Sequence, residues 1–142
     1  MTFRALGLAA VFAGVSALIA AMPASAHHSF AAEFDENKCA EHTGTLTGVD
    51  WQNPHAYFFI ESKDESGKVV KKTFQTSSLA NMIRGGTPRG YFVENIGKTV
   101  IVRGCASYAG TDQRYAASWV RVGIEPIHRV GQDVEGAFGT NN

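Results

Sequence analysis

Histidine is the residue type in this chain with the clearest capacity for chemistry, and it occurs at positions 27, 28, 42, 55 and 128. His27 and His28 directly follow Ala26, the last residue of a predicted cleavage site. Cleavage there would make His27 the first residue, able to bind a metal through both its α-amino nitrogen and its ring. Either His28 or His55 could supply a third nitrogen, and such a T-shaped set of three nitrogens suits Cu(II). The predicted ligands are therefore His27 with His55 or His28, and copper is the predicted metal.

The residues before His55 suggest that its ring has a well-defined position, because it opens a predicted strand directly after Asn53-Pro54. We expect Asn53 and Trp51 to support the ring from outside the ligand set, as partners of metal ligands commonly do. Simpler interpretations stay open. A His-His pair at a chain start is often a solvated tail, and a lone histidine at a strand start is often a hydrogen-bonded structural residue. His42 and His128 have no evident partners in the sequence and are expected at the surface.

Residues 1–26 have the pattern of a secretory signal peptide. Arg4 is their one charged side chain, residues 5–22 form an uncharged apolar run, and Ala-Ser-Ala at 24–26 is a small-residue cleavage site. The run approaches the ~20 residues that span a bilayer, but its many small residues and the well-placed cleavage site favour removal. We therefore expect a periplasmic or secreted protein with no membrane span after cleavage.

The composition argues against nucleic acid as a partner and against the common enzyme classes. The chain of 142 residues carries 13 basic and 13 acidic side chains, a balance that gives no electrostatic footprint for nucleic acid. It contains no Gly-x-Ser-x-Gly, no His-Glu-x-x-His, no Walker-type loop and no dinucleotide fingerprint. We expect no enzyme, with a small copper-dependent redox enzyme as the lowest-ranked alternative. The expected partners are a metal ion or a periplasmic protein.

Hydrophobic periodicity downstream of the signal predicts three strands, a helical segment and two further strands. The strands are expected at 43–51, 55–61, 69–75, 99–105 and 114–124. One or two short helices are expected between the third and fourth strands, the first of them capped by Ser77 or Ser78. This order fits an all-β fold with short helices, a five-stranded OB-like Greek-key barrel. The predicted division of the chain is signal peptide (1–26), N-terminal lead-in (27–41), barrel domain (42–128) and flexible C-terminal tail (129–142).

The two cysteines test this topology. In such a barrel the first and fourth strands run antiparallel side by side, so the start of the first meets the end of the fourth. Cys39 precedes the first predicted strand and Cys105 ends the fourth, which brings them together. An exported protein can keep a disulfide, and closing so long a loop would stabilise the fold by roughly 2–4 kcal/mol. A redox pair or thiolate metal site is the weaker alternative because no Cys-x-x-Cys exists.

Two motifs resemble small exported bacterial proteins grouped as domain-of-unknown-function family 6152. They are His27-His28-Ser29-Phe30 after the cleavage site and the segment from Trp51 to His55, Trp-Gln-Asn-Pro-His. The likeness extends from about residue 27 to residue 122. It implies a bacterial, periplasmic β-barrel domain. It implies no activity and no catalytic residues, because the family's function is unassigned.

Two classes of function remain after these observations. One is a periplasmic protein that binds a metal, with copper as the expected ion. The other is a binding module without metal, in which an aromatic groove takes a small ligand or a protein partner. Trp51, Tyr57, Phe58 and Phe59 could line that groove, although core packing is the commoner use of such residues. Burial of Trp51, Tyr57 and Phe59 in the core would exclude the groove.

Overall fold

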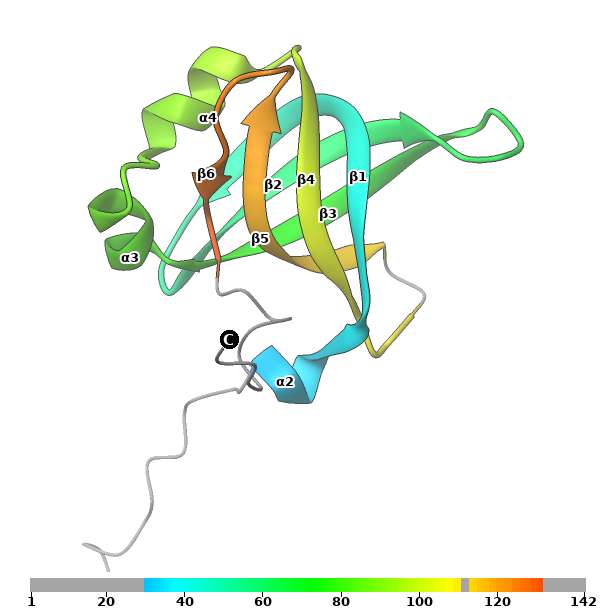
Figure 1. The fold of residues 1–142 in the computed structure, drawn as a ribbon, viewed down its shortest axis with the longest axis horizontal. Coiled ribbons are helices and arrows are strands. Elements are labelled where there is room, and N and C mark those ends of the chain that lie inside the picture. The colour runs from blue at the N-terminus through cyan, green and yellow to red at the C-terminus, as the bar shows by residue number, and fades with distance from the viewer. Residues whose placement is uncertain (1–29, 111–112, 132–142) are drawn as a thin grey trace, which may run out of the picture.

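Six strands and three short helices make up the part of the chain that this computed structural model describes, residues 30–110 and 113–131 (Figure 1). In chain order these elements are α2 (Phe30–Glu33), β1 (Phe34–Trp51), β2 (His55–Lys63), β3 (Val69–Ser78), α3 (Leu79–Arg84), α4 (Arg89–Asn95), β4 (Thr99–Ser107), β5 (Arg114–Val122) and β6 (His128–Arg129). The expected class, mostly β-sheet with short helices, is confirmed. So is the order of three strands, helices and further strands.

The strands hydrogen-bond in the order β3-β2-β1-β4-β5-β6, with antiparallel neighbours throughout this series. In addition β3 pairs in parallel with β5, where Thr73 lies opposite Arg114 and Gln75 opposite Ala116. Each of β1 to β5 therefore has a partner on both sides, and the pairings run in a closed ring. Because β6 pairs only with residues near Trp119 and Val120 of β5, it is an addition to this ring.

The first strand is longer than the sequence indicates. β1 begins at Phe34, inside the expected lead-in of 27–41. Its pairing with β4 is irregular at the start, since Phe34 lies opposite Ser107 and the next pair is Cys39 with Cys105. The four residues 35–38 of β1 thus stand against the single residue Ala106 of β4, as in an enlarged β-bulge. They are polar without alternation, which is why the pattern conceals the strand.

The expected tail of 129–142 also begins too early. His128 and Arg129 form β6, and Val130 behind them is buried. The backbone of Val130 accepts a hydrogen bond from the Ser77 amide at 2.8 Å and donates one to the Ser118 carbonyl at 3.0 Å. A strand of two residues is too short to show alternation, so the sequence gives no sign of it. Residues 132–142 lie outside the described part.

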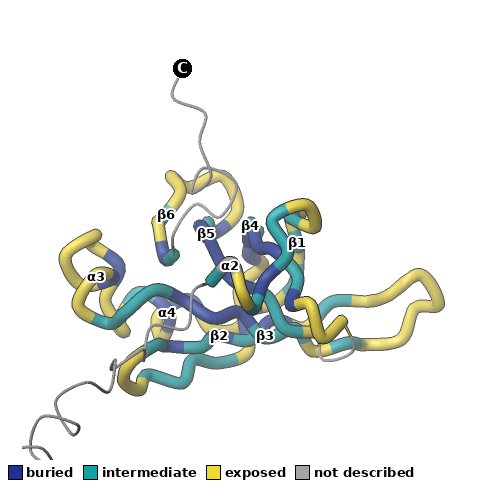
Figure 2. Tube along the Cα trace, turned by 90° about the horizontal axis from the view of Figure 1, so that it is seen from below, coloured by how far each residue is buried: buried dark blue, intermediate teal, exposed yellow. Residues whose placement is uncertain are grey.

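The core fills the inside of the ring with large apolar side chains. Leu46, Phe58, Phe74, Val102 and Val120 are all fully buried or nearly so. The rings of Phe58 and Phe74 stack at 5.2 Å between centroids. Dark blue buried stretches follow the strands in Figure 2, while the hairpin between β2 and β3 and most of α3 are exposed.

The helices between β3 and β4 follow from local signals in the sequence. Of the two expected caps it is Ser78 that begins α3, because its hydroxyl accepts a hydrogen bond from the Asn81 amide at 3.3 Å. Gly85 ends this helix. α4 packs onto the core through Phe92, whose ring lies 5.0 Å from that of Phe58. None of the described helices is long and apolar enough to cross a membrane.

Candidate functional site

His55 is the first residue of β2 and lies at the end of the ring where α2 also lies. Its half-buried ring meets the ring of Phe30 edge-on, with 5.8 Å between centroids and 86° between planes. The Nδ1 atom of His55 is buried and has no hydrogen-bond partner in the described part of the chain. The fold therefore offers one nitrogen ligand that is held in place and not otherwise used.

The other predicted ligands, His27 and His28, lie outside the described residues. Phe30, which follows them closely in the chain, is described, and it contacts His55. Among residues 30–110 and 113–131 no group of three or more His, Cys, Asp or Glu side chains could hold a metal ion. A metal site at His55 would thus need ligands from outside the described residues, and the predicted ligands His27 and His28 are among these.

The two residues expected to support His55 lie just before and within the turn that precedes it. Trp51 ends β1, and its half-buried ring packs toward Phe92 in the core at 6.4 Å. Asn53 is exposed in the turn, and no hydrogen bond joins it to His55 in the described structure. The supporting roles of Asn53 and Trp51 therefore stay predictions.

A polar network that the sequence does not indicate holds α2 against the strands. The Arg114 Nη2 atom donates to Oε1 of Gln75 at 2.8 Å and also to Oε1 of Glu33, the last residue of α2. Its guanidinium carbon lies 5.6 Å above the Phe34 ring. The Glu33 carbonyl accepts a further hydrogen bond from the Tyr108 amide at 3.0 Å. No local signal could reveal this network, since Glu33 and Arg114 stand at opposite ends of the domain.

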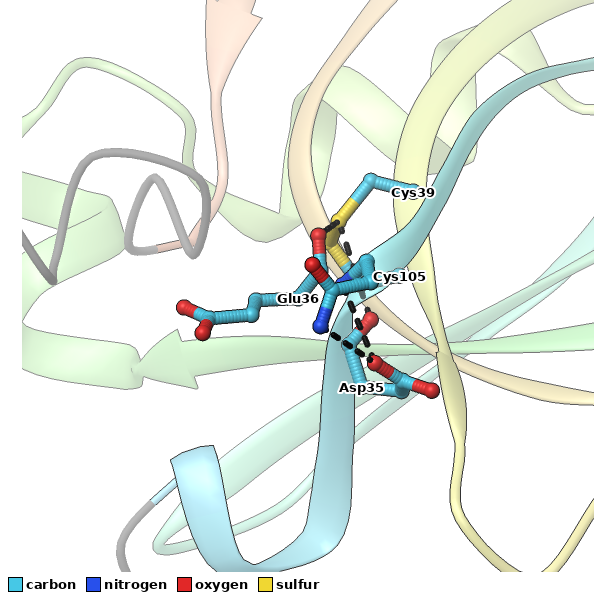
Figure 3. The surroundings of a disulfide bond; sticks show 5 residues. Asp35, Glu36, Cys39 and Cys105 are labelled. Atoms are coloured by element: carbon cyan, nitrogen blue, oxygen red, sulfur yellow. Dashed lines mark hydrogen bonds between the residues drawn. A yellow bond between two sulfur atoms is a disulfide. The ribbon is translucent and has the colours of Figure 1, made fainter.

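The predicted disulfide between Cys39 and Cys105 is confirmed (Figure 3). Cys39 lies within β1 rather than before it, at the point where regular pairing with β4 resumes after the bulge. The bulge is ordered by its own polar groups, because Oδ1 of Asp35 accepts a hydrogen bond from the Asn37 amide at 3.0 Å. The Sγ atom of Cys39 lies 3.2 Å from the Glu36 carbonyl oxygen. Cys105 is fully buried with Phe34.

His42 is not the surface residue that the sequence suggests. Its ring is half-buried, 4.3 Å from the ring of Tyr115 and 5.5 Å from that of Phe74. Nζ of Lys72 lies 3.3 Å from its Nδ1. The pKa of His42 is lowered to about 4, mainly by burial and also by the positive charges of Lys72 and Arg103, against an opposing backbone hydrogen bond. His42 is therefore a neutral, partly internal residue.

His128 also has partners that the sequence does not show. It pairs with Val120 in the short β5–β6 ladder, and its ring lies 4.0 Å from the ring of Tyr91 in α4. Burial raises the pKa of the Tyr91 hydroxyl, and the nearby charge of Glu125 raises it further. This contact joins α4 to β6, so His128 is better explained by packing than by solvent exposure.

The aromatic residues of β1 and β2 divide between the two faces of the sheet. Phe58 is fully buried in the core. Trp51, Tyr57 and Phe59 are only partly buried, and Nζ of Lys71 lies 4.1 Å above the Phe59 ring. Full burial would have excluded an aromatic binding surface. Because it is not observed, that interpretation stays open.

The chain was also compared with known proteins. One protein family, described as a family of unknown function (DUF6152), matches residues 16–114, which is more than half of the chain. The match confirms the resemblance suggested by the His-His-Ser segment and the Trp-x-Asn-Pro-His motif. No curated protein and no solved structure matches the chain significantly.

Proposed function

The chain belongs to the DUF6152 family of unknown function, and from its site we propose an exported protein that binds Cu(II) through His27 and His55. In this proposal the segment 1–26 is a signal peptide and its removal creates the α-amino group of His27. The amino nitrogen, the His27 ring and Nδ1 of His55 form the ligand set. The protein acts in the periplasm or outside the cell.

The contact between Phe30 and His55 carries the proposal. Their ring centroids are 5.8 Å apart, and only a short stretch of chain separates Phe30 from His27. An extended chain covers about 3.3–3.6 Å per residue, so the His27 main chain can reach about 10 Å from Phe30. The ring of His55, 5.8 Å from that of Phe30, lies within that radius.

The unused nitrogen of His55 is a second support. Leaving a buried polar atom without a partner costs roughly 1–3 kcal/mol, and Nδ1 of His55 is such an atom among the described residues. A metal ion bound there would remove this cost. Neutral imidazole is a preferred ligand of copper. His28 remains the alternative source of the third nitrogen, and a site built from it would not need His55.

Isothermal titration with Cu(II) tests the proposal on protein that begins at His27, with glycine as a competing ligand. Adding one Met before His27 removes the free amine from the ligand residue, and His55→Ala removes the ring. Loss of a ligand should weaken binding by at least ~10-fold, since even indirect partners of a ligand contribute 10–100-fold. His128→Ala is the matched control, because it removes a half-buried histidine that packs on Tyr91.

The outcomes separate the possible ligand sets. Weakening by both the Met extension and His55→Ala, but not by His128→Ala, supports the proposed site. Weakening by the extension and by His28→Ala, with no effect of His55→Ala, would assign the third nitrogen to His28. Unchanged affinity in the extended protein would exclude the amino-terminal chelate altogether. We propose a binding role rather than catalysis, so the copper-loaded protein should not consume oxygen or peroxide when a reductant is present.

We also infer that the ring of strands is an OB-like Greek-key barrel. The closed pairing of β1 to β5 and the helices between β3 and β4 support this. Proteins of this architecture commonly bind on an outer face, and Tyr57 and Phe59 lie on one outer face of β2 with partly exposed rings. A metal-independent ligand on that face is the second candidate function. It predicts that Tyr57→Ala and Phe59→Ala abolish ligand binding while Cu(II) affinity stays the same.

A further inference from the structure

We infer that Arg114 is a positioning residue for the N-terminal metal-binding segment. It holds α2 in place through Glu33, and so keeps Phe30 against His55. This inference rests on the proposed Cu(II) site and deepens it, because it explains how ligands distant in the sequence are kept together.

Arg114 stands where three elements meet. It is the first residue of β5 and pairs with Thr73 at the parallel seam between β3 and β5. One of its nitrogens donates both to Gln75, which is 5 % exposed in β3, and to Glu33 at the end of α2. α2 lies below the strands in Figure 1 and in front of β3, β4 and β5 in Figure 2. Arg114 thus connects the seam of the ring to the turn that covers its end.

The chemistry of arginine suits this role. A guanidinium offers five donors in a rigid plane, so it can bond acceptors on two different elements at once. A lysine ammonium on a flexible stem orients its partners less well. The Arg114 and Glu33 side chains are 32 % and 33 % exposed, so solvent screens their attraction. The ion pair between Arg114 and Glu33 therefore fixes the position of α2 more than it raises the stability of the whole fold.

α2 needs such support because it is a single turn of four residues. An isolated turn is unstable, since nucleating a helix costs more than its few hydrogen bonds return. Besides the Glu33 contacts, Phe30 stacks on Phe34 at 5.7 Å. Without Arg114 the turn would be held by fewer contacts, and Phe30 would spend less time beside His55. The effective concentration of His27 at His55 would then fall.

Charge reversal tests the inference on protein that begins at His27. Arg114→Glu and Glu33→Arg each place like charges together, and each should weaken Cu(II) binding by about 10-fold. The double variant restores an attractive pair and should recover most of the affinity. Arg114→Lys should give an intermediate value. Arg89→Glu is the matched control, because this exposed arginine begins α4, well separated from α2 in Figure 1, and its reversal should leave affinity unchanged.

A metal-free measurement keeps this test independent of the proposed function. Proton NMR of the apo protein should show a nuclear Overhauser effect between the rings of Phe30 and His55. The effect should be lost in Arg114→Glu and recovered in the double variant, while the melting temperature changes little. An effect that persists in Arg114→Glu would overturn the positioning role.

Measurements of Cu(II) binding then distinguish the positioning role of Arg114 from the proposed metal site. If His55→Ala weakens Cu(II) binding but both charge reversals leave it within twofold of wild type, the positioning role is wrong and the proposed site stands. If His55→Ala and the Met extension have no effect, the proposed site is wrong and Arg114 positions no ligand. A melting temperature that falls steeply in Arg114→Glu and is not recovered in the double variant would make Arg114 a general structural residue, against the inference.

Discussion

Two half-buried histidines on neighbouring strands differ in the charges around them, although each has a buried ring nitrogen without a partner among the described residues, Nε2 in His42 and Nδ1 in His55. His42 in β1 has the Lys72 ammonium 3.3 Å from its Nδ1 and two aromatic rings against its own. His55 in β2 has an uncharged partner, Phe30, and a buried Nδ1 that no described group uses. Residue type and approximate burial are the same at both places. The neighbours decide what each ring can do.

The charge near His42 opposes any added cation. The pKa of this ring is lowered to about 4, mainly by burial and also by the positive charges of Lys72 and Arg103. A metal ion would meet the same repulsion as a proton, because both bring positive charge to the ring. The side chain of Phe30 beside His55 brings no such charge. We therefore regard His42 as a structural residue and His55 as the candidate metal ligand.

The largest expected effect comes from the disulfide that lies between these two regions. Replacing both Cys39 and Cys105 by serine should lower the free energy of unfolding by roughly 2–4 kcal/mol, because the disulfide then no longer restricts the conformations of the unfolded chain. Urea denaturation of the double variant and the oxidised wild type measures this. In the same variant the lowered pKa of His42 should persist, as its contacts with Lys72 and Tyr115 do not involve the disulfide.

The region of His55 should respond differently. Cys39 marks the point where β1 resumes its pairing after the bulge, and α2 lies on the far side of that bulge. Loss of the bond should therefore weaken the nuclear Overhauser effect between Phe30 and His55. The contrary result would be an unchanged nuclear Overhauser effect together with a pKa of His42 that returns to its ordinary range. It would show that the disulfide supports the surroundings of His42 and not those of His55.

These outcomes bear on what the sequence can predict. The disulfide follows from topology, because strand order alone brings Cys39 to Cys105. The cap at Ser78 follows from local hydrogen bonding. By contrast, the start of β1 is concealed by residues 35–38, whose bulge removes the alternation that marks a strand. β6 is concealed by its length of two residues.

The surroundings of the histidines could not be predicted because they are made by distant residues. Lys72 belongs to β3 and is distant from His42 in the sequence, so no residue close to His42 in the chain indicates this contact. Arg114 reaches Glu33 from the other end of the domain. Spacing along the chain identified His55 as a defined position. The contact with Phe30, which links it to the segment of His27, required the fold.

A smaller effect is expected from the pH dependence of stability at His42. Its pKa is about 4 in the folded protein and has the ordinary histidine value of 6.5 in the unfolded chain, so between these values the unfolded chain binds more protons. The free energy of unfolding should therefore rise with pH across this window and level off above it. His42→Gln removes this contribution. The wild type should gain about 1–2 kcal/mol more than the variant between pH 4.5 and 7.5, allowing for solvent screening.

Urea denaturation at both pH values measures this difference, and parallel pH curves for the two proteins would contradict it. Lys72→Met is the companion variant. It removes a positive charge beside the ring, so the pKa of His42 should rise toward its ordinary range, which NMR titration detects. A pKa that stays near 4 would show that the charge of Lys72 contributes little to keeping the ring neutral.

The smallest effect is expected at Ser78, which lies opposite His55 in the pairing of β2 with β3. Ser78→Ala removes the hydroxyl that accepts from the Asn81 amide, and losing such a cap costs about 1 kcal/mol. Urea denaturation should show this loss, while Cu(II) affinity stays within twofold because the cap serves α3 and not the His55 ring. Ser77→Ala is the matched control, since Ser77 holds Val130 through its backbone amide rather than its side chain. A larger loss at Ser77 than at Ser78 would contradict the cap. Weaker Cu(II) binding in Ser78→Ala would show instead that the start of α3 positions the His55 ring. In that case His42 and His55 would both depend on residues of β3, and the contrast between them would be smaller.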